Sequence, residues 1–189
     1  AANAQADETD PPPEIDVVAP VAVVSDYRFR GISLSDRDPA VQGSLDVSHT
    51  PTGLYAGAWG STIARYGGAK TEIDLYAGWK NSLGPFDLDI GGQFYLYPGG
   101  NGINSYEFFS YLGKTIGPAE IRAGLVYAPS QDNLGNTDNL YLTSDARVGI
   151  PETPVTLTAS VGYENGAFEG PAGSKLDWPL GAEATKGPF

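Results

Sequence analysis

Residues 86–97 read FDLDIGGQFYLY, and this stretch predicts the fold. Its even positions carry mostly apolar side chains, whereas its odd positions carry aspartates, a glutamine and tyrosines. Alternation with a period of two is typical of a β-strand that has one apolar and one polar face. Ten residues at about 3.3 Å each, tilted by about 40°, cover roughly 25 Å, which is the height of the apolar band of an outer membrane barrel.

The same alternation recurs along most of the chain. Residues 71–81, 119–128, 139–150 and 154–164 each separate apolar from polar side chains on successive positions. The facing of 53–61, around Tyr55 and Trp59, is the least clear from the sequence. We predict ten antiparallel strands in this chain, at 19–30, 39–49, 53–61, 71–81, 85–97, 104–114, 119–128, 139–150, 154–164 and 175–186.

Prolines mark the turns at one end of these strands. They recur 34, 33, 36 and 34 residues apart, at Pro51, Pro85, Pro118, Pro154 and Pro188. Longer segments rich in Gly, Asn, Asp and Ser lie midway between them, at 31–38, 62–70, 98–103, 129–138 and 165–174. A helical repeat could have this period, but 25 glycines, 15 prolines and two-residue alternation exclude amphipathic helices. Short turns at one end and long loops at the other indicate an all-β, antiparallel up-and-down transmembrane β-barrel.

The ends of the chain carry different signals. Residues 1–17 are acidic and proline-rich, which predicts a flexible periplasmic tail, and the barrel domain is expected over 18–189. The first residues have the small-x-small pattern of a signal-peptidase site, so we expect an exported protein whose signal peptide is already removed. Residues 186–189 repeat the turn chemistry of 83–86, so we expect a further hairpin and twelve strands in the complete protein. A closed ten-stranded barrel is the alternative.

A segment near the N-terminus resembles a known family. Residues 25–33 read SDYRFRGIS, and PAVQG at 39–43 and GLYAGAW at 53–59 follow. These motifs resemble the TorF family of porin-like outer membrane proteins of proteobacteria, and the resemblance extends from about Val21 to Phe189. It implies a barrel in the outer membrane and a porin label, but no substrate and no catalytic residue. The chain departs from the family in lacking the last strands.

Charged residues are expected on the polar face of the strands, because a charge on the lipid face costs about 2–4 kcal/mol for Arg or Lys. Acidic side chains predominate in this set, which predicts a narrow aqueous path for small polar solutes or cations. The alternative is a barrel sealed by Arg–carboxylate pairs, serving as a structural or partner-binding subunit of an envelope assembly. The predicted lumen-lining residues are Asp26, Arg28, Arg30, Asp46, Glu72, Asp74, Asp87, Asp89, Glu107, Arg122, Asp145 and Arg147.

The sequence offers little material for catalysis. The chain has no Cys, and its only histidine, His49, adjoins a predicted turn, so zinc sites and histidine-assisted triads are not expected. We therefore predict neither an enzyme nor a cofactor. Outer membrane lipid and lipopolysaccharide are the expected partners, with other envelope proteins or copies of the chain as further candidates. A net charge of −12 argues against nucleic acid. Predicted interface aromatics are Tyr27, Phe29, Trp79, Tyr97, Tyr106, Phe108, Tyr127, Tyr163 and Trp178.

Overall fold

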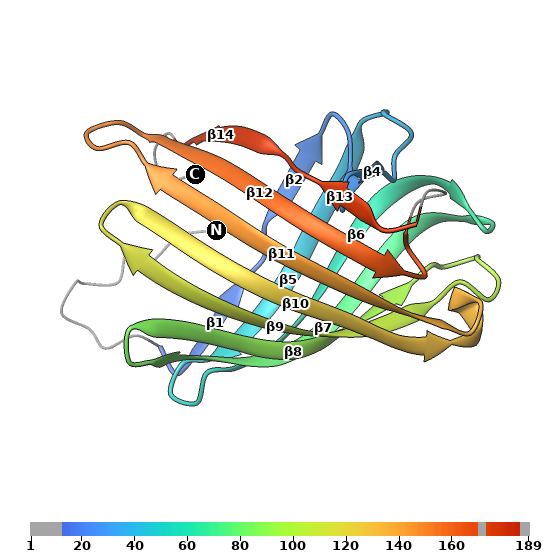
Figure 1. Ribbon diagram of the computed structural model, residues 1–189, viewed down its shortest axis with the longest axis horizontal. Helices are drawn as coiled ribbons and strands as arrows, with labels where there is room; N and C mark the ends of the chain where they lie inside the picture. Colours follow the sequence, from blue (N-terminus) through green and yellow to red (C-terminus); the bar gives the residue numbers. More distant parts are fainter. Residues whose placement is uncertain (1–12, 170–172, 186–189) are drawn as a thin grey trace.

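The computed structural model describes residues 13–169 and 173–185 of the chain (Figure 1). They form one large antiparallel sheet and a small two-stranded sheet, with a single 3-10 turn, η1 (Asp132–Leu134). In the large sheet, β5 to β12 follow one another in chain order. The strands are β1 (Ile15–Val18), β2 (Val21–Val24), β3 (Arg28–Phe29), β4 (Ile32–Ser33), β5 (Ala40–His49), β6 (Leu54–Tyr66), β7 (Ala69–Leu83), β8 (Phe86–Leu96), β9 (Ser105–Ile116), β10 (Ala119–Gln131), β11 (Thr137–Gly149), β12 (Val155–Gly166), β13 (Lys175–Asp177) and β14 (Leu180–Ala184).

Both edges of the large sheet are broken strands. β1 and β2 pair with successive halves of β5, and β13 and β14 pair in the same way with β12. Pro20 and Pro179 lie at the two interruptions, where each carbonyl still accepts a hydrogen bond of 3.1 Å from the neighbouring strand. Proline cannot donate to a ladder and is tolerated at such edges. If β1 with β2 counts as one edge strand and β13 with β14 as the other, the large sheet has ten strands, which is the number predicted for this chain.

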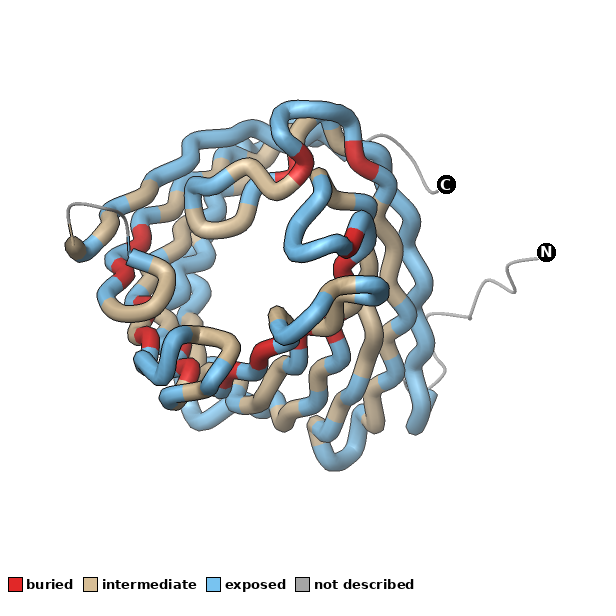
Figure 2. The backbone as a smooth tube through the Cα atoms, turned by 90° about the vertical axis from the view of Figure 1, so that its right-hand side faces the viewer, coloured by how far each residue is buried: buried red, intermediate tan, exposed pale blue. Residues whose placement is uncertain are grey.

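The sheet curls around a central space when viewed from the loop end (Figure 2). Figure 1 shows the short turns gathered at the left and the ends of β6, β10 and β12 at the right. Across residues 13–169 and 173–185, no ladder joins β1 or β2 to β13 or β14. The predicted all-β antiparallel architecture is therefore confirmed, whereas closure into a barrel stays a prediction.

The two faces of the sheet have the opposite polarity to those of a water-soluble protein. The concave side buries carboxylates, with Glu72 at 1% and Glu164 at 0% exposure. The convex side exposes large apolar residues, including Ile90, Phe94, Leu125 and Leu142. The predicted alternation is confirmed for these strands, and the burial also settles the facing of β6: Trp59 packs against buried Tyr27 and Leu54 is exposed.

Several predicted boundaries are wrong. The expected loop 62–70 is almost entirely strand, because β6 and β7 meet in a tight turn at Gly67 and Gly68, both with positive φ. The expected first strand, 19–30, ends at Val24, after which the chain turns towards the concave side. The edge strand begins at Ile15, inside the predicted tail. Residues 1–12 and 186–189 lie outside the described part, so the flexible tail and the further hairpin stay predictions.

Tyrosines on the concave face lie over glycines of neighbouring strands. Tyr76 is paired across the ladder with Gly57, and Tyr111 with Gly124. A Cβ built on either glycine would overlap the tyrosine ring. Such aromatic cover of a glycine allows strong local curvature while keeping the site packed. In the described part of the chain, no helix is long and apolar enough to cross a membrane.

Candidate functional site

The segment between β2 and β5 folds into a small hairpin on the concave side of the sheet. Phe29 pairs with Ile32, so β3 and β4 are joined by a loop of two residues, Arg30 and Gly31. Both have positive φ, +46° and +81°. Two such residues in succession make the type I′ turn, whose twist suits a tight hairpin. A non-glycine residue in this backbone region costs on the order of 1–3 kcal/mol, so the contacts of Arg30 have to compensate.

Arg30, at the tip of the hairpin, bridges two distant strands. Its Nη2 lies 2.7 Å from Oε1 of Glu107 in β9, and its Nη1 lies 2.9 Å from Oε1 of Glu164 in β12. The guanidinium also stacks on the rings of Phe29 and Tyr141, at 4.6 and 4.5 Å from their centres. Its side chain is only 7% exposed. Paired hydrogen bonds and aromatic stacking are the contacts that suit a buried arginine.

The base of the β3–β4 hairpin contacts β6, β7 and β8, which lie across the concave side from β12. The hydroxyl of Tyr27 donates to Oε1 of Glu72 at 3.1 Å, and the Tyr27 ring packs against Trp59 at 5.3 Å. The Phe29 ring meets Tyr95 edge-on at 5.9 Å. The backbone N–H of Ala64 donates to the carbonyl of Leu34, just after the hairpin. The hairpin is therefore held by β6, β7, β8, β9 and β12.

Asp26 organises the entrance to the hairpin. Its Oδ1 accepts hydrogen bonds from Ser33 and Ser35 at 2.5 and 3.2 Å, and its Oδ2 pairs with Arg28 at 2.7 Å. The Ser33 hydroxyl, with help from Arg28, lowers the pKa of Asp26 below its ordinary value despite some desolvation. This network forms within one segment of chain and keeps Asp26 charged.

Four buried carboxylates surround the hairpin. Glu72, Asp74, Glu107 and Glu164 are each at most 5% exposed. Two cations form ion pairs with these carboxylates. Arg30 pairs with Glu107 and Glu164, and Nζ of Lys175 lies 2.5 Å from Oε2 of Glu164. Within residues 13–169 and 173–185, the donors to Glu72 and Asp74 are neutral: the Tyr27 hydroxyl and the amide of Gln93, the latter at 2.7 Å. The buried cluster thus carries more acidic than basic groups.

The other predicted lumen residues lie nearer the short turns or at the base of the hairpin. Asp46 accepts from Tyr76, Asp89 accepts from Tyr55 at 2.7 Å, and Asp87 accepts from Ser82 at 2.6 Å. Arg122 pairs with Asp145 at 3.4 Å, and Arg147 with Glu183 at 2.6 Å. Arg28 is 54% exposed and pairs with Asp26 inside its own hairpin. Of the twelve predicted lumen residues, the structure therefore gathers Arg30, Glu72, Asp74 and Glu107, whereas the other eight form separate ion pairs or accept hydrogen bonds from hydroxyl groups.

The hairpin separates the hollow parts of the concave side. A cavity of about 400 Å³ lies at the loop end, lined by Phe29, Glu72 and Glu107 among others. Cavities of about 550 and 500 Å³ lie towards the short turns, around Asp89 and Tyr111. A smaller one, about 240 Å³, connects the surroundings of Arg30 with Arg122 and Asp145. Arg30 and Glu107 thus line the smallest of these four cavities, which we call the narrow part of the concave side.

Sequence reasoning missed two members of the buried charged cluster, Glu164 and Lys175. Glu164 continues the inward series Thr156, Thr158, Ser160 and Gly162, so extending the alternation by one step would have found it. Lys175 had no such signal, because it lies in a short strand next to a loop. Tyr27 and Phe29, predicted at the membrane interfaces, are instead packed on the concave side.

Metal binding finds no support in the described residues, where no group of three His, Cys, Asp or Glu side chains is arranged to hold an ion. His49, at the end of β5, contacts the hydroxyl of Thr52 through Nδ1 at 2.7 Å. The histidine thus has a local partner in the turn that follows its strand.

The fold and the site define the class of this protein. It is an all-β protein whose curled antiparallel sheet has an apolar convex surface and a charged concave one. The chain belongs to the family described as "Bacterial protein of unknown function (Gcw_chp)", whose model matches residues 7–189. No curated protein and no solved structure matches the chain. This description mentions neither a function nor TorF proteins, so the resemblance stays a prediction.

Proposed function

We propose that this chain is a β-barrel of the bacterial outer membrane, and that its interior conducts small cations or polar solutes past the β3–β4 hairpin. The observation that carries the proposal is the inverted polarity of the sheet. Leu75, Phe108, Leu112 and Val161 are exposed on its convex side, while Glu72 and Glu164 are buried on the other. Water would penalise such an exterior, whereas lipid favours it.

Strand dimensions support a membrane location. β5 to β12 contain between 10 and 15 residues each. At about 3.3 Å per residue and a tilt of about 40°, such strands span roughly 25–38 Å, enough for the apolar part of a bilayer. Lipid and lipopolysaccharide are then the partners of the convex face. Twelve strands in the complete protein remain part of this proposal.

The charge inside supports cations as the transported species. The wider regions near the short turns are only slightly acidic, since Asp46, Asp87, Asp89, Glu120 and Asp145 share their walls with Lys80, Lys114, Arg122 and Arg147. The larger excess of acid lies beside the hairpin, where Glu72 and Asp74 form no ion pair with any described cation. An acidic lining lowers the electrostatic barrier for cations and raises it for anions. The hairpin narrows this path, so conduction through it should be small.

A non-conducting barrel is the second candidate. It is favoured by the ion pairs of Arg30, which fill the middle of the concave side with a folded segment and two buried carboxylates. In that case the loops, and not the interior, would carry the function, as a structural or partner-binding subunit of an envelope assembly.

Single-channel recording of the purified protein in a planar bilayer under a KCl gradient tests the proposal. Stable openings with a reversal potential that favours potassium are expected. Demonstrable insertion without openings would reject conduction in favour of the second candidate. Failure of the folded protein to enter lipid at all would reject the membrane assignment itself.

A further inference from the structure

The cavity at the loop end has walls of a particular kind. Aromatic side chains from three different elements line it, among them Phe29 of the hairpin, Tyr66 of β6 and Tyr95 of β8. Tyr66 packs edge-on against Tyr97, with ring centres 5.3 Å apart. Ile103 and Phe168 contribute apolar surface from the loops. A volume of about 400 Å³ lies within the range of small-molecule pockets, which are mostly apolar with a few polar groups.

One polar group in this cavity lacks a partner. Glu72 is 1% exposed, and its Oε1 accepts the hydrogen bond from Tyr27. Its Oε2 is buried and has no hydrogen-bond partner. Asp74, two residues along the same face of β7, also has one buried oxygen, Oδ1, without a partner. A buried carboxylate that is neither paired nor fully hydrogen-bonded is unfavourable, and structures normally satisfy it.

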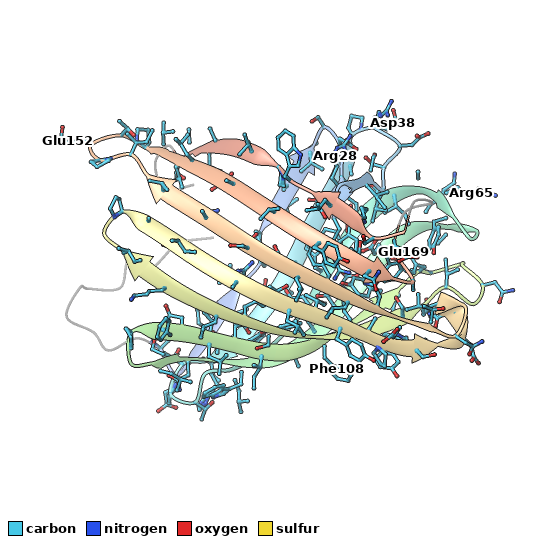
Figure 3. The ribbon with its side chains drawn as sticks, in the orientation of Figure 1. Arg28, Asp38, Arg65, Phe108, Glu152 and Glu169 are labelled. Carbon is cyan, nitrogen blue, oxygen red and sulfur yellow. The ribbon has the colours of Figure 1, made fainter. Side chains whose placement is uncertain are left out.

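The described cations around this cavity already have carboxylate partners or point away, and one of them, Lys175, lines the cavity itself. Arg30 is shared by Glu107 and Glu164, and Lys175 also pairs with Glu164. Arg65 borders the cavity but is exposed, and Figure 3 shows its side chain at the outer right edge of the molecule. Among the described residues, no Lys, Arg or His forms an ion pair with Glu72 or Asp74.

We propose that the loop-end cavity binds a small organic ammonium ion, with its charged nitrogen at Oε2 of Glu72 and its apolar part against the tyrosines. A carboxylate and an ammonium form a charge-assisted hydrogen bond, and aromatic faces attract a desolvated cation. A metal ion fits less well, because calcium and magnesium take six or more oxygen ligands, including water, whereas most of the residues that line this cavity are aromatic or aliphatic.

This inference deepens the proposed function, because it names the class of solute that the interior would hold. Binding itself, however, does not require conduction. The cavity lies on the loop side of the Arg30 ion pairs, so a ligand can reach it without passing the hairpin. Binding and ion flow can therefore be measured separately.

Titration of the folded full-length protein in detergent micelles tests the site. The probes are 2-phenylethylammonium and its neutral counterpart 2-phenylethanol, followed by calorimetry. We expect the ammonium ion to bind more than tenfold more tightly than the alcohol, and Glu72→Gln to remove this preference. Asp38→Asn, which changes an exposed carboxylate on the outer loop in Figure 3, should leave the preference unchanged.

A second variant keeps the site testable if Glu72→Gln does not fold. Ile103→Trp, on a loop at the cavity wall, keeps the carboxylate and fills the space, so it should weaken the ammonium ion and the alcohol alike. Absence of ammonium binding to the wild-type protein, or an unchanged preference in folded Glu72→Gln, would overturn the site. So would full ammonium affinity in Ile103→Trp. Binding by a protein that conducts no ions would overturn the pore alone, whereas conduction without binding would overturn the site alone.

Discussion

Nη2 of Arg30 lies 2.7 Å from Oε1 of Glu107, although 77 residues separate the two in the chain. The contact joins the tip of the β3–β4 hairpin to β9, and Glu164 extends it to β12. Removal of a buried arginine that pairs with two carboxylates is costly, because it leaves both negative charges unpaired. This ion-pair triad makes the hairpin a fixed part of the concave side.

Replacement of Arg30 should free the hairpin. In Arg30→Ala the loss of the buried pairs should destabilise the docked hairpin by about 3–5 kcal/mol, and the single-channel conductance should rise because the narrow part widens. Arg37→Ala removes an exposed arginine of the same segment and should leave conductance unchanged. Equal conductance in wild type and folded Arg30→Ala would show that the hairpin does not limit ion flow.

Glycine at position 31 is required by its surroundings as well as by its backbone. A Cβ there would lie 2.8 Å from Cβ of Asp177, and φ is +81°. Gly135 has a similar φ, +67°, but open space around it. We expect Gly31→Ala to lower the midpoint of urea unfolding in liposomes clearly more than Gly135→Ala. Both variants incur the backbone cost of about 1 kcal/mol, so identical midpoints would mean that the hairpin tip is not packed against β13.

A glycine substitution within the sheet tests the packing of Tyr111 over Gly124. A Cβ on Gly124 would overlap the Tyr111 ring, whereas one on Gly113 would have its nearest neighbour at 3.7 Å. Gly124→Ala should destabilise the protein by about 1–3 kcal/mol, as overpacking does, and Gly113→Ala should be nearly neutral. Urea unfolding followed by tyrosine and tryptophan fluorescence measures the difference. A neutral Gly124→Ala would argue against close packing on the concave side.

Asp89 should contribute to ion selectivity. It lines two of the wider regions near the short turns and is held by the Tyr55 hydroxyl. Asp89→Asn removes a negative charge at nearly constant size, so the reversal potential under a KCl gradient should move towards zero. The exposed Asp38→Asn serves as the control. A reversal potential that does not move would mean that Asp89 lies outside the conducting path.

Much of the sheet follows from local pattern. Alternation predicts β7, β8, β10, β11 and β12 and the side that each of their residues faces, because a strand places successive side chains on opposite faces. Prolines and glycines predict the short turns at Pro51, Pro85, Pro118 and Pro154. These features depend on neighbours in sequence and can be read without knowing which strands pair.

The hairpin could not be predicted in the same way. Residues 19–30 contain enough apolar residues to resemble a strand, and only Arg30-Gly31 signals a two-residue turn. Its inward course depends on Glu107 and Glu164, which are distant in sequence and approach only after the sheet has curled. Alternation predicts that Glu107 faces inward, but it does not identify the cation that meets it there.

The most direct test of the account is the environment of the convex face. The chain contains no Cys, so single spin labels can be placed at Ile121 and Leu125, on the convex side, and at Arg122 and Thr143, on the concave side. Collision with oxygen and with a water-soluble nickel complex is then compared in liposomes. We predict that the convex labels meet oxygen and the concave labels meet nickel; equal access of nickel to all four would contradict a membrane-embedded sheet.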